Sequence, residues 1–407
     1  MGGVSGGYFD HAATTPLRPQ ARAALVAELD ATGNASSLHA SGRRARKVVE
    51  ESRESIAAEL GVRPSEVVFT SGGTEADNLA VKGTYWARRD ADPEYATVLV
   101  SAIEHHAVLD PVRWLARSQG ARVVELPVGP DGCVDPQVLE RELIAHDGTV
   151  ALVSVMSANN ETGMIQPIER ISTLCQRFGV PLHSDAVQSV GWYAQPDAAA
   201  PRPDLLTVSA HKFGGPIGVG ALVVRGQEVV PLLHGGGQQN DARSGTLMTA
   251  QIAAMAAALA AAAADRDRAV PQVADLRDSL IRGVLEVLPD TRINGSTAEP
   301  RLPNIAALAF PDAAADALLM LLDVAGIECS AGSACTAGVS RPSHVLAAMG
   351  VSPELARGSL RFSLGWDSTA RDVDRLLTVL PDAVARARRA QVGGRTAVHR
   401  SSRDSRL

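Results

Sequence analysis

Short apolar runs alternate with amphipathic stretches between about residues 65 and 225 of this 407-residue chain. The run at 150–155 is apolar at almost every position, as in a strand that is buried on both faces of a parallel sheet. Stretches with helical periodicity separate the runs, and such alternation is typical of a doubly wound α/β fold. The sequence therefore predicts a mostly parallel sheet, with strands at 66–70, 96–100, 122–127, 150–155, 181–185, 205–208 and 220–224.

The pattern changes after about residue 265, where helices and short strands no longer alternate regularly. We expect a large domain over 15–262, and a smaller α+β domain formed by 1–14 together with 263–390. The final stretch, 391–407, is polar and rich in arginine, so it is predicted to be a disordered tail. Separate helices are expected in the small domain at 275–288, 314–325, 342–349 and 370–387.

Composition narrows the class of protein further. With 45% hydrophobic residues the chain can bury a large core, and a net charge of -6 argues against nucleic acid as the main partner. The most apolar stretch, 250–264, is mostly alanine and too short to span a membrane, so we expect a buried or semi-buried helix there. No cysteine pair has C-x-x-C spacing, which argues against a zinc ribbon and favours a reducing cytoplasm. The four cysteines are Cys133, Cys175, Cys329 and Cys335.

Lysine is scarce in this chain, which contains only Lys47, Lys82 and Lys212. Arginine can replace lysine as a surface cation, but its guanidinium stays protonated and cannot act as an amine nucleophile. Lys212 follows the predicted strand at 205–208 and precedes Gly214, so it lies at the carboxyl end of a strand, where open α/β sheets bind ligands. We therefore interpret Lys212 as a candidate Schiff-base lysine for pyridoxal phosphate; a solvated loop lysine is the alternative.

Three other polar side chains come at the ends of predicted strands. Thr74 follows a Gly-Gly turn that could hold a phosphate, His105 could stack on a planar cofactor, and Asp185 could pair with a protonated ring nitrogen. Each has an ordinary alternative as a helix-capping residue. Because parallel strands bring their carboxyl ends to one edge, these residues and Lys212 together predict a cofactor site.

Cys335 lies in a run of serine, alanine and glycine at 330–338, whereas structural cysteines usually lie in apolar elements. Such a position predicts an exposed and reactive thiol. Cys329 ends a predicted short strand at 326–328, Cys133 follows a turn, and Cys175 lies on the buried stripe of a helix. We interpret these three cysteines as structural.

The chain resembles the cysteine desulfurases, which are pyridoxal-phosphate enzymes of the class V aminotransferase group. It is most similar to the form that serves iron–sulfur cluster assembly, and the resemblance runs from Tyr8 to about Pro381. The motifs that carry it are Asp10-His11-Ala12-Ala13-Thr14-Thr15-Pro16, Ser71-Gly72-Gly73-Thr74-Glu75, Glu104-His105, Asn159-Asn160-Glu161, Ser184-Asp185-Ala186-Val187-Gln188, Ser209-Ala210-His211-Lys212, Arg243-Ser244-Gly245-Thr246 and Ser330-Ala331-Gly332-Ser333-Ala334-Cys335.

The resemblance implies the type I fold of pyridoxal-phosphate-dependent transferases and the conversion of L-cysteine to L-alanine. Lys212 would carry the cofactor and remove the Cα proton, Cys335 would take the sulfur as a persulfide, and His105 would move thiol protons. Arg361, Asn160 and Asn34 would bind the substrate carboxylate, although Ala35 departs from the family pattern beside Asn34. The cofactor-binding residues implied are Gly73, Thr74, His105, Asn160, Asp185, Gln188, Ser209, His211, Lys212 and Thr246.

Thr246 is expected to reach the phosphate of the other subunit, so the resemblance implies a homodimer. It also implies a sulfur-acceptor or cluster-scaffold protein as partner. No resident metal, nucleic acid or membrane is expected, although Cys335 is a candidate transient ligand for a cluster iron. A selenocysteine lyase or another class V enzyme remains an alternative, as does a non-catalytic sulfur or cluster scaffold. A yellow colour from bound cofactor would distinguish an enzyme from a scaffold.

The Cys335→Ala variant should still bind pyridoxal phosphate, because the predicted cofactor residues are untouched. It should form no alanine from L-cysteine above background, because no thiolate remains to attack the substrate sulfur. Cofactor absorbance and alanine release measure the two properties, and normal turnover in this variant would contradict the role assigned to Cys335.

Overall fold

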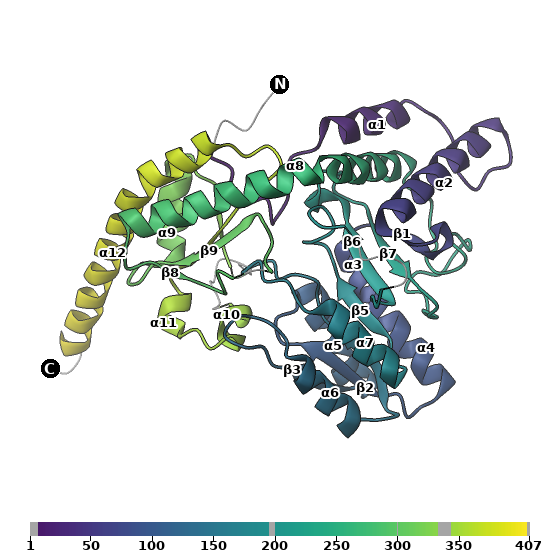
Figure 1. Cartoon of the computed structure of the whole chain (residues 1–407), viewed down its shortest axis with the longest axis horizontal. Coiled ribbons are helices and arrows are strands. Elements are labelled where there is room, and N and C mark those ends of the chain that lie inside the picture. The colour runs from purple at the N-terminus through teal and green to yellow at the C-terminus, as the bar shows by residue number, and fades with distance from the viewer. Residues whose placement is uncertain (1–6, 195–199, 299, 333–342, 405–407) are drawn as a thin grey trace.

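The computed structural model describes residues 7–194, 200–298, 300–332 and 343–404. In this part of the chain a seven-stranded sheet forms the centre of the larger lobe (Figure 1). Only β7 of this described sheet runs antiparallel to its neighbours, so the predicted α/β class with a mostly parallel sheet is confirmed. Every strand expected in this sheet lies within one residue of its predicted bounds. The order is β1 (Val67–Thr70), β7 (Gly220–Val224), β6 (Leu205–Ser209), β5 (Leu182–Asp185), β4 (Val150–Ser154), β2 (Thr97–Ser101) and β3 (Arg122–Leu126).

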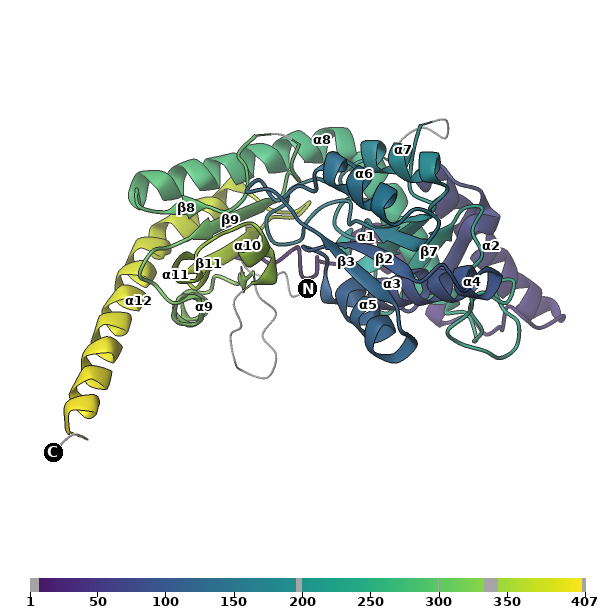
Figure 2. The same cartoon turned by 90° about the horizontal axis from the view of Figure 1, so that it is seen from below.

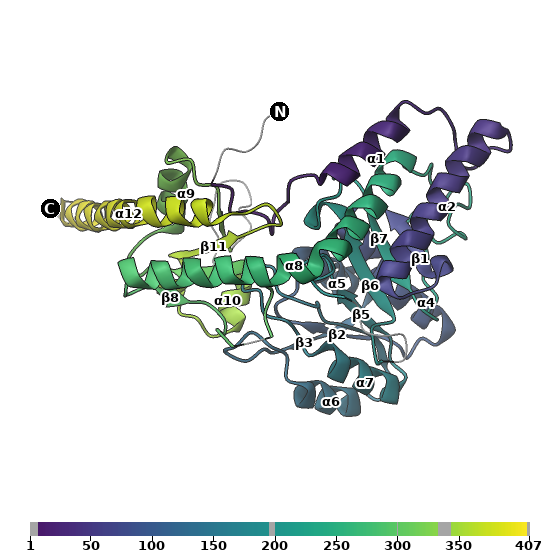
Figure 3. The same cartoon turned by 45° about the horizontal axis from the view of Figure 1, so that its top comes forward.

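Helices cover both faces of this sheet, because side chains that alternate along a strand point to opposite faces. Val67 and Phe69 pack with α1, α2 and α8 (Thr249–Val287) on one face, whereas Val68 packs with α3, α4 and α5 on the other. Figure 3 shows α1, α2 and α8 side by side along the first face. Polar groups of the strands are therefore accessible mainly at the strand ends. The helices of this lobe are α1 (Pro19–Leu29), α2 (Ala40–Leu60), α3 (Gly73–Asn78), the π turn at Leu79–Gly83, α4 (Thr84–Ala91), α5 (His106–Gln119), α6 (Pro136–Ala145) and α7 (Ile168–Phe178).

A smaller antiparallel sheet forms the centre of the second lobe, and Figure 2 shows α8 crossing above β8 and β9. The N-terminal segment belongs to this lobe: the Phe9 N–H donates to the carbonyl of Glu328, and the Ser363 N–H donates to the carbonyl of Phe9, both at 2.7 Å. Phe9 is fully buried in the core here. The elements are β10 (Ser330–Ala331), β11 (Ser359–Ser363), β9 (Ile305–Ala309), β8 (Arg292–Ile293), α9 (Ala315–Val324), α10 (His344–Ala348), α11 (Pro353–Ala356) and α12 (Ala370–Asp404).

One helix prediction is wrong. The sequence predicts separate helices at 250–264 and 275–288, but a single α8 spans Thr249–Val287 with Pro271 inside it. Proline in a helix interior removes one backbone hydrogen bond and is usually destabilising. Here Leu259 packs in the core of the large lobe and Leu280 in the core of the small one, so packing at both ends stabilises the continuous helix. This helix crosses the domain boundary predicted at 262–263.

The prediction of a disordered tail from residue 391 also differs from the structure, where α12 continues to Asp404. Ala387 is the last residue of this helix in the hydrophobic core. Beyond it the sequence is rich in arginine, a good helix former, and the helix continues despite Gly393 and Gly394. The end of α12 projects from the small lobe in Figures 1 and 2. None of the helices within the described ranges is long and apolar enough to cross a membrane.

Phe9 should be essential for the stability of the small lobe. Its ring is 0% exposed and meets the ring of Phe362 edge to face, with centroids 6.2 Å apart. We expect Phe9→Ala to lower the free energy of unfolding by about 3–5 kcal/mol through lost burial and a residual cavity. Val324→Ala is the control, because Val324 is 86% exposed and its loss should cost less than about 0.5 kcal/mol. Urea unfolding followed by circular dichroism measures both, and equal effects would contradict the packing described.

Candidate active site

The carboxyl ends of the central strands meet a cavity of about 580 Å³ that also reaches the small sheet. Thirteen residues were predicted to form the site, and ten of them line this one cavity. Asn34 and Thr246 do not line it, and Cys335 lies outside the described residues. The ten residues are Gly73, Thr74, His105, Asn160, Asp185, Gln188, Ser209, His211, Lys212 and Arg361.

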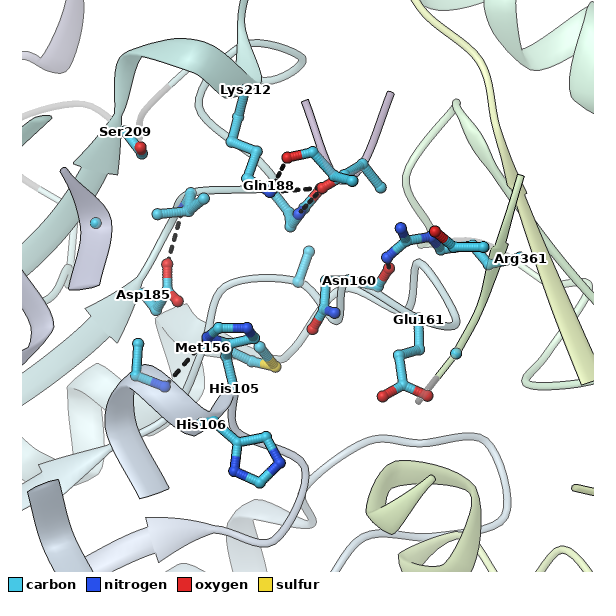
Figure 4. A pocket seen from close by; sticks show the side chains of 18 of the residues that line it. His105, His106, Met156, Asn160, Glu161, Asp185, Gln188, Ser209, Lys212 and Arg361 are labelled. Atoms are coloured by element: carbon cyan, nitrogen blue, oxygen red, sulfur yellow. Dashed lines mark hydrogen bonds between the residues drawn. The ribbon is translucent and has the colours of Figure 1, made fainter. Parts of the chain in front are cut away.

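Lys212 ends a short 3₁₀ turn (Ala210–Lys212) directly after β6, and its side chain points into the cavity (Figure 4). Nζ donates to the carbonyls of Ala12 at 2.6 Å and of Ala13 at 2.8 Å. Burial, and then the positive charge of Arg361, lowers the pKa of Lys212 to about 8. A substantial fraction of the amine is therefore neutral near physiological pH, which is the form that attacks a carbonyl.

Asp185 ends β5 on the opposite side of the cavity, where its Oδ1 accepts the N–H of Val187 at 2.9 Å. Burial, and then the nearby charge of Asp77, raises the pKa of Asp185 to about 7. Asp77 also lines the cavity, is 1% exposed, and has its pKa raised to about 7 by burial. Two buried carboxyl groups in one wall favour a cationic partner in the cavity.

The sequence analysis missed Asp77. It follows Thr74 by three positions in α3, so the two residues lie on the same face of that helix. This spacing is the signal that could have identified it.

His105 caps α5 and lines the cavity at the same time, so the two readings of this residue are compatible. Its Nδ1 accepts the N–H of Ala107 at 3.1 Å, which leaves Nε2 to carry the proton of the neutral ring. Burial, followed by the charge of Lys212, lowers the pKa of His105 to about 4. The ring is thus neutral at pH 7 and can both stack and exchange a proton.

Arg361 reaches the cavity from β11 of the small sheet. Nη1 donates to the carbonyl of Asn160 at 2.9 Å, and Nη2 donates to Oδ1 of Asp10 at 2.7 Å. Among the described residues, the buried Nε of Arg361 has no hydrogen-bond partner. Arg361 thus forms a structural ion pair with Asp10, and its Nε remains as a donor for an anionic ligand.

The glycine turn after β1 forms the end of the cavity where phosphate binding was predicted. Glu75 closes this turn by accepting the N–H of Ser71 at 2.9 Å, and it pairs with Nε of Arg243 at 2.7 Å. Arg243 precedes Thr246 by three residues, so the ion pair between Glu75 and Arg243 holds the segment that contains Thr246 near the glycine turn. Thr246 itself does not line the cavity. Asn34 lies in an exposed loop, where its Oδ1 accepts the N–H of Ser36 at 2.9 Å.

Cys329 lines the cavity, which the sequence analysis did not predict. Burial, and then the charge of Asp10, raises the pKa of its thiol to about 12, so the thiol stays protonated and unreactive. Glu161 and His344 were also missed and line the same cavity, as does Gly332, the last described residue before the gap at 333–342.

Comparison with known proteins gives consistent results across sequence and structure. The family model described as aminotransferase class-V matches residues 7–376. An IscS-like cysteine desulfurase of Mycobacterium tuberculosis is 54% identical over 384 residues, covering 94% of this chain and 97% of that protein. Cysteine desulfurase IscS of Dictyoglomus turgidum is 41% identical over 94% of this chain and 95% of its own length.

Solved structures agree with these sequence matches. A structure titled NifS-like protein superimposes with a TM-score of 0.85 at 33% identity, covering 93% of this chain and 99% of that one. A structure titled SspA in complex with cysteine superimposes with a TM-score of 0.77 at 31% identity, covering 89% of this chain and 100% of that one.

The environment of Lys212 predicts a measurable pH dependence. Below its pKa the amine is protonated and unreactive, so the rate of aldehyde addition to the cofactor-free protein should rise through about pH 8 and then level off. The adduct can be trapped with borohydride and quantified on Lys212 by mass spectrometry. In Arg361→Gln the midpoint of this pH profile should move to higher pH, because the positive charge that disfavours protonation of Lys212 is gone. A wild-type midpoint near 10.5, the ordinary lysine value, would contradict the environment described.

Proposed function

This chain belongs to the class-V aminotransferases and, within them, to the cysteine desulfurases, as its motifs indicated, and from this premise we propose that its cavity converts L-cysteine to L-alanine. The sulfur would pass to Cys335 as a persulfide. The observation that carries the proposal is that one cavity gathers Lys212, Asp185 and Arg361 from β6, β5 and β11. These residues supply an amine nucleophile, a buried carboxyl group and a guanidinium at three sides of the same space.

The residues present fit pyridoxal phosphate. A cavity of about 580 Å³ is of the size that holds small ligands. A protonated ring nitrogen would offset the repulsion between the buried carboxyl groups of Asp77 and Asp185. When bound, the cofactor would supply an electron sink for negative charge at the substrate carbons. Asp185 would hold the ring nitrogen, Gln188 the ring hydroxyl and His105 the ring face. The phosphate would be held by Gly73, Thr74, Ser209 and His211, together with Thr246 of a second subunit.

The side chains of this chain would divide the remaining tasks. Arg361 and Asn160, with Asn34, would bind the substrate carboxylate. Lys212 Nζ, neutral in part because its pKa is about 8, would take the Cα proton. The neutral ring of His105 would exchange protons with the thiols.

The sulfur step transfers one atom without an external oxidant. The thiolate of Cys335 would attack the sulfur of the substrate, so that an S–S bond forms as the Cβ–S bond breaks. The electron pair of the broken bond stays with the substrate carbon, which is then protonated and leaves as alanine. A thiol acceptor would later take the outer sulfur and return Cys335 to a thiol.

We extend the proposal to partners and location. The ion pair of Glu75 with Arg243 supports a segment that presents Thr246 to a second copy of the chain, as a homodimer would require. A sulfur acceptor, in iron–sulfur cluster assembly or in another thiolation reaction, would receive the persulfide. A reducing cytoplasm suits a reaction that depends on a free thiol.

Replacing Lys212 by arginine tests the proposal, because arginine keeps the charge and removes the amine nucleophile. We expect Lys212→Arg to form no covalent cofactor adduct and to lower alanine formation from L-cysteine by roughly 10³-fold or more. Lys82→Arg is the matched control, since Lys82 does not line the cavity and packs over the ring of Trp114. Alanine and sulfide are measured with a thiol reductant present to release the persulfide.

The wild-type protein should release alanine and sulfide in equal amounts. A yellow wild-type protein that forms no alanine would contradict the proposed substrate. Full activity in Lys212→Arg would contradict the role of the lysine. The same assay with selenocysteine reports whether the selenium analogue is a substrate.

A further inference from the structure

Glu161 lies in the turn after β4, and the mechanism above gives it no task. The turn is held by Asn159, whose Oδ1 accepts the N–H groups of Glu161 at 2.9 Å and Thr162 at 3.0 Å. Asn159 is itself fixed, because its Nδ2 donates to the carbonyl of Ile103 at 3.1 Å. The backbone of Glu161 therefore has a defined position, next to the predicted substrate ligand Asn160 (Figure 4).

The carboxylate of Glu161 contacts both described ends of the segment that contains residues 333–342. At the far end, Ser343 Oγ donates to Glu161 Oε2 at 2.5 Å. At the near end, a Cβ added to Gly332 would lie 2.6 Å from the same Oε2, so the backbone of Gly332 packs against this oxygen. One carboxylate oxygen thus joins two residues that are eleven positions apart in the sequence.

The contact at Ser343 also orders the element that follows. Ser343 Oγ accepts the N–H of Leu346 at 3.1 Å and so caps the N-terminus of α10. The first residue of this helix, His344, lines the cavity. Glu161 is 6% exposed, and Arg361 is the positive charge that most offsets its burial. Keeping a carboxyl group buried is costly, which is consistent with a specific task for this side chain.

We propose that Glu161 is a positioning residue that fixes Gly332 and Ser343 relative to the cavity, so that Cys335, carried between them, can reach the substrate sulfur. This inference rests on the proposed function. Fixing the two described residues that flank Cys335 sets the points in the chain from which its thiol must reach the substrate, and a small misplacement of a reacting group slows a reaction. Glu161 follows Asn160 directly. The same turn would therefore position both the substrate carboxylate, through Asn160, and the residues that flank Cys335, through Glu161.

The test separates two steps of the reaction. Binding of L-cysteine changes the cofactor absorbance and needs no Cys335, whereas persulfide formation needs it. In the holoenzyme, Glu161→Gln should leave the absorbance change and its half-saturating cysteine concentration within about twofold of wild type. It should slow persulfide formation by about 10- to 100-fold, the scale expected for a small misplacement of a reacting group.

Matched variants address the two ends of the segment. Ser343→Ala removes the donor to Glu161, and Gly332→Ala places a methyl group against its carboxylate, so both should slow persulfide formation selectively. Ser352→Ala is the control for Ser343→Ala, because Ser352 caps α11 without touching Glu161. Glu169→Gln is the control for charge, since Glu169 is exposed on α7. Both controls should match wild type.

Several outcomes would overturn the inference. One is wild-type persulfide formation in Glu161→Gln, and another is an equal fall in both steps, which indicates a role in substrate binding or folding. If Glu161→Gln does not fold, Ser343→Ala and Gly332→Ala carry the test, and wild-type rates in both overturn it. A wild-type enzyme that forms no alanine contradicts the proposed function instead, so the two failures are distinguishable.

Discussion

The hydrogen bonds from Lys212 Nζ to the carbonyls of Ala12 and Ala13 join the two lobes at the centre of the site. The segment that carries these carbonyls begins in the core of the small lobe at Phe9. It continues through Asp10, which pairs with Arg361, and ends at Thr15, whose N–H donates to the carbonyl of His211 at 3.1 Å. The distance between the amine on the large sheet and the guanidinium on the small sheet therefore depends on one short stretch of chain.

The second constraint is electrostatic. The cavity holds buried groups of both signs, and burial moves the pKa of Asp185 up to about 7 and that of Lys212 down to about 8. Groups with such shifts are typical of catalytic sites, because small changes in their surroundings then decide which one carries a proton. A cationic ring beside Asp185 would favour the ionised carboxylate and lower its pKa again. Binding of such a cofactor would thus be coupled to the charge state of the site.

Sequence patterns were sufficient for the large sheet and for the principal groups of the site. Mostly apolar runs predicted most strands of that sheet, because strands buried on both faces require them. The strand that ends at Asp185 was predicted although it contains His183 and Ser184. The scarcity of lysine identified Lys212, and strand ends identified Asp185 and His105. The long α8 was not predicted, because its continuity through Pro271 depends on packing against two cores that only the folded chain brings together.

Glu161 could not be predicted either, since its partner Ser343 lies 182 positions away in the chain. The role predicted for Thr246 would also depend on contacts beyond one copy of the chain, which no local pattern encodes. Thr246 therefore stays a prediction about the homodimer, and Asn34 stays a prediction about the substrate carboxylate.

The most direct test of the account is a single turnover without reductant. The holoenzyme is mixed with L-cysteine, alanine is quantified, and the extra sulfur is located by mass spectrometry of peptides. The account predicts one alanine per subunit and a persulfide on the peptide that contains Cys335. Alanine without modified Cys335, or sulfur on Cys329 instead, would contradict it.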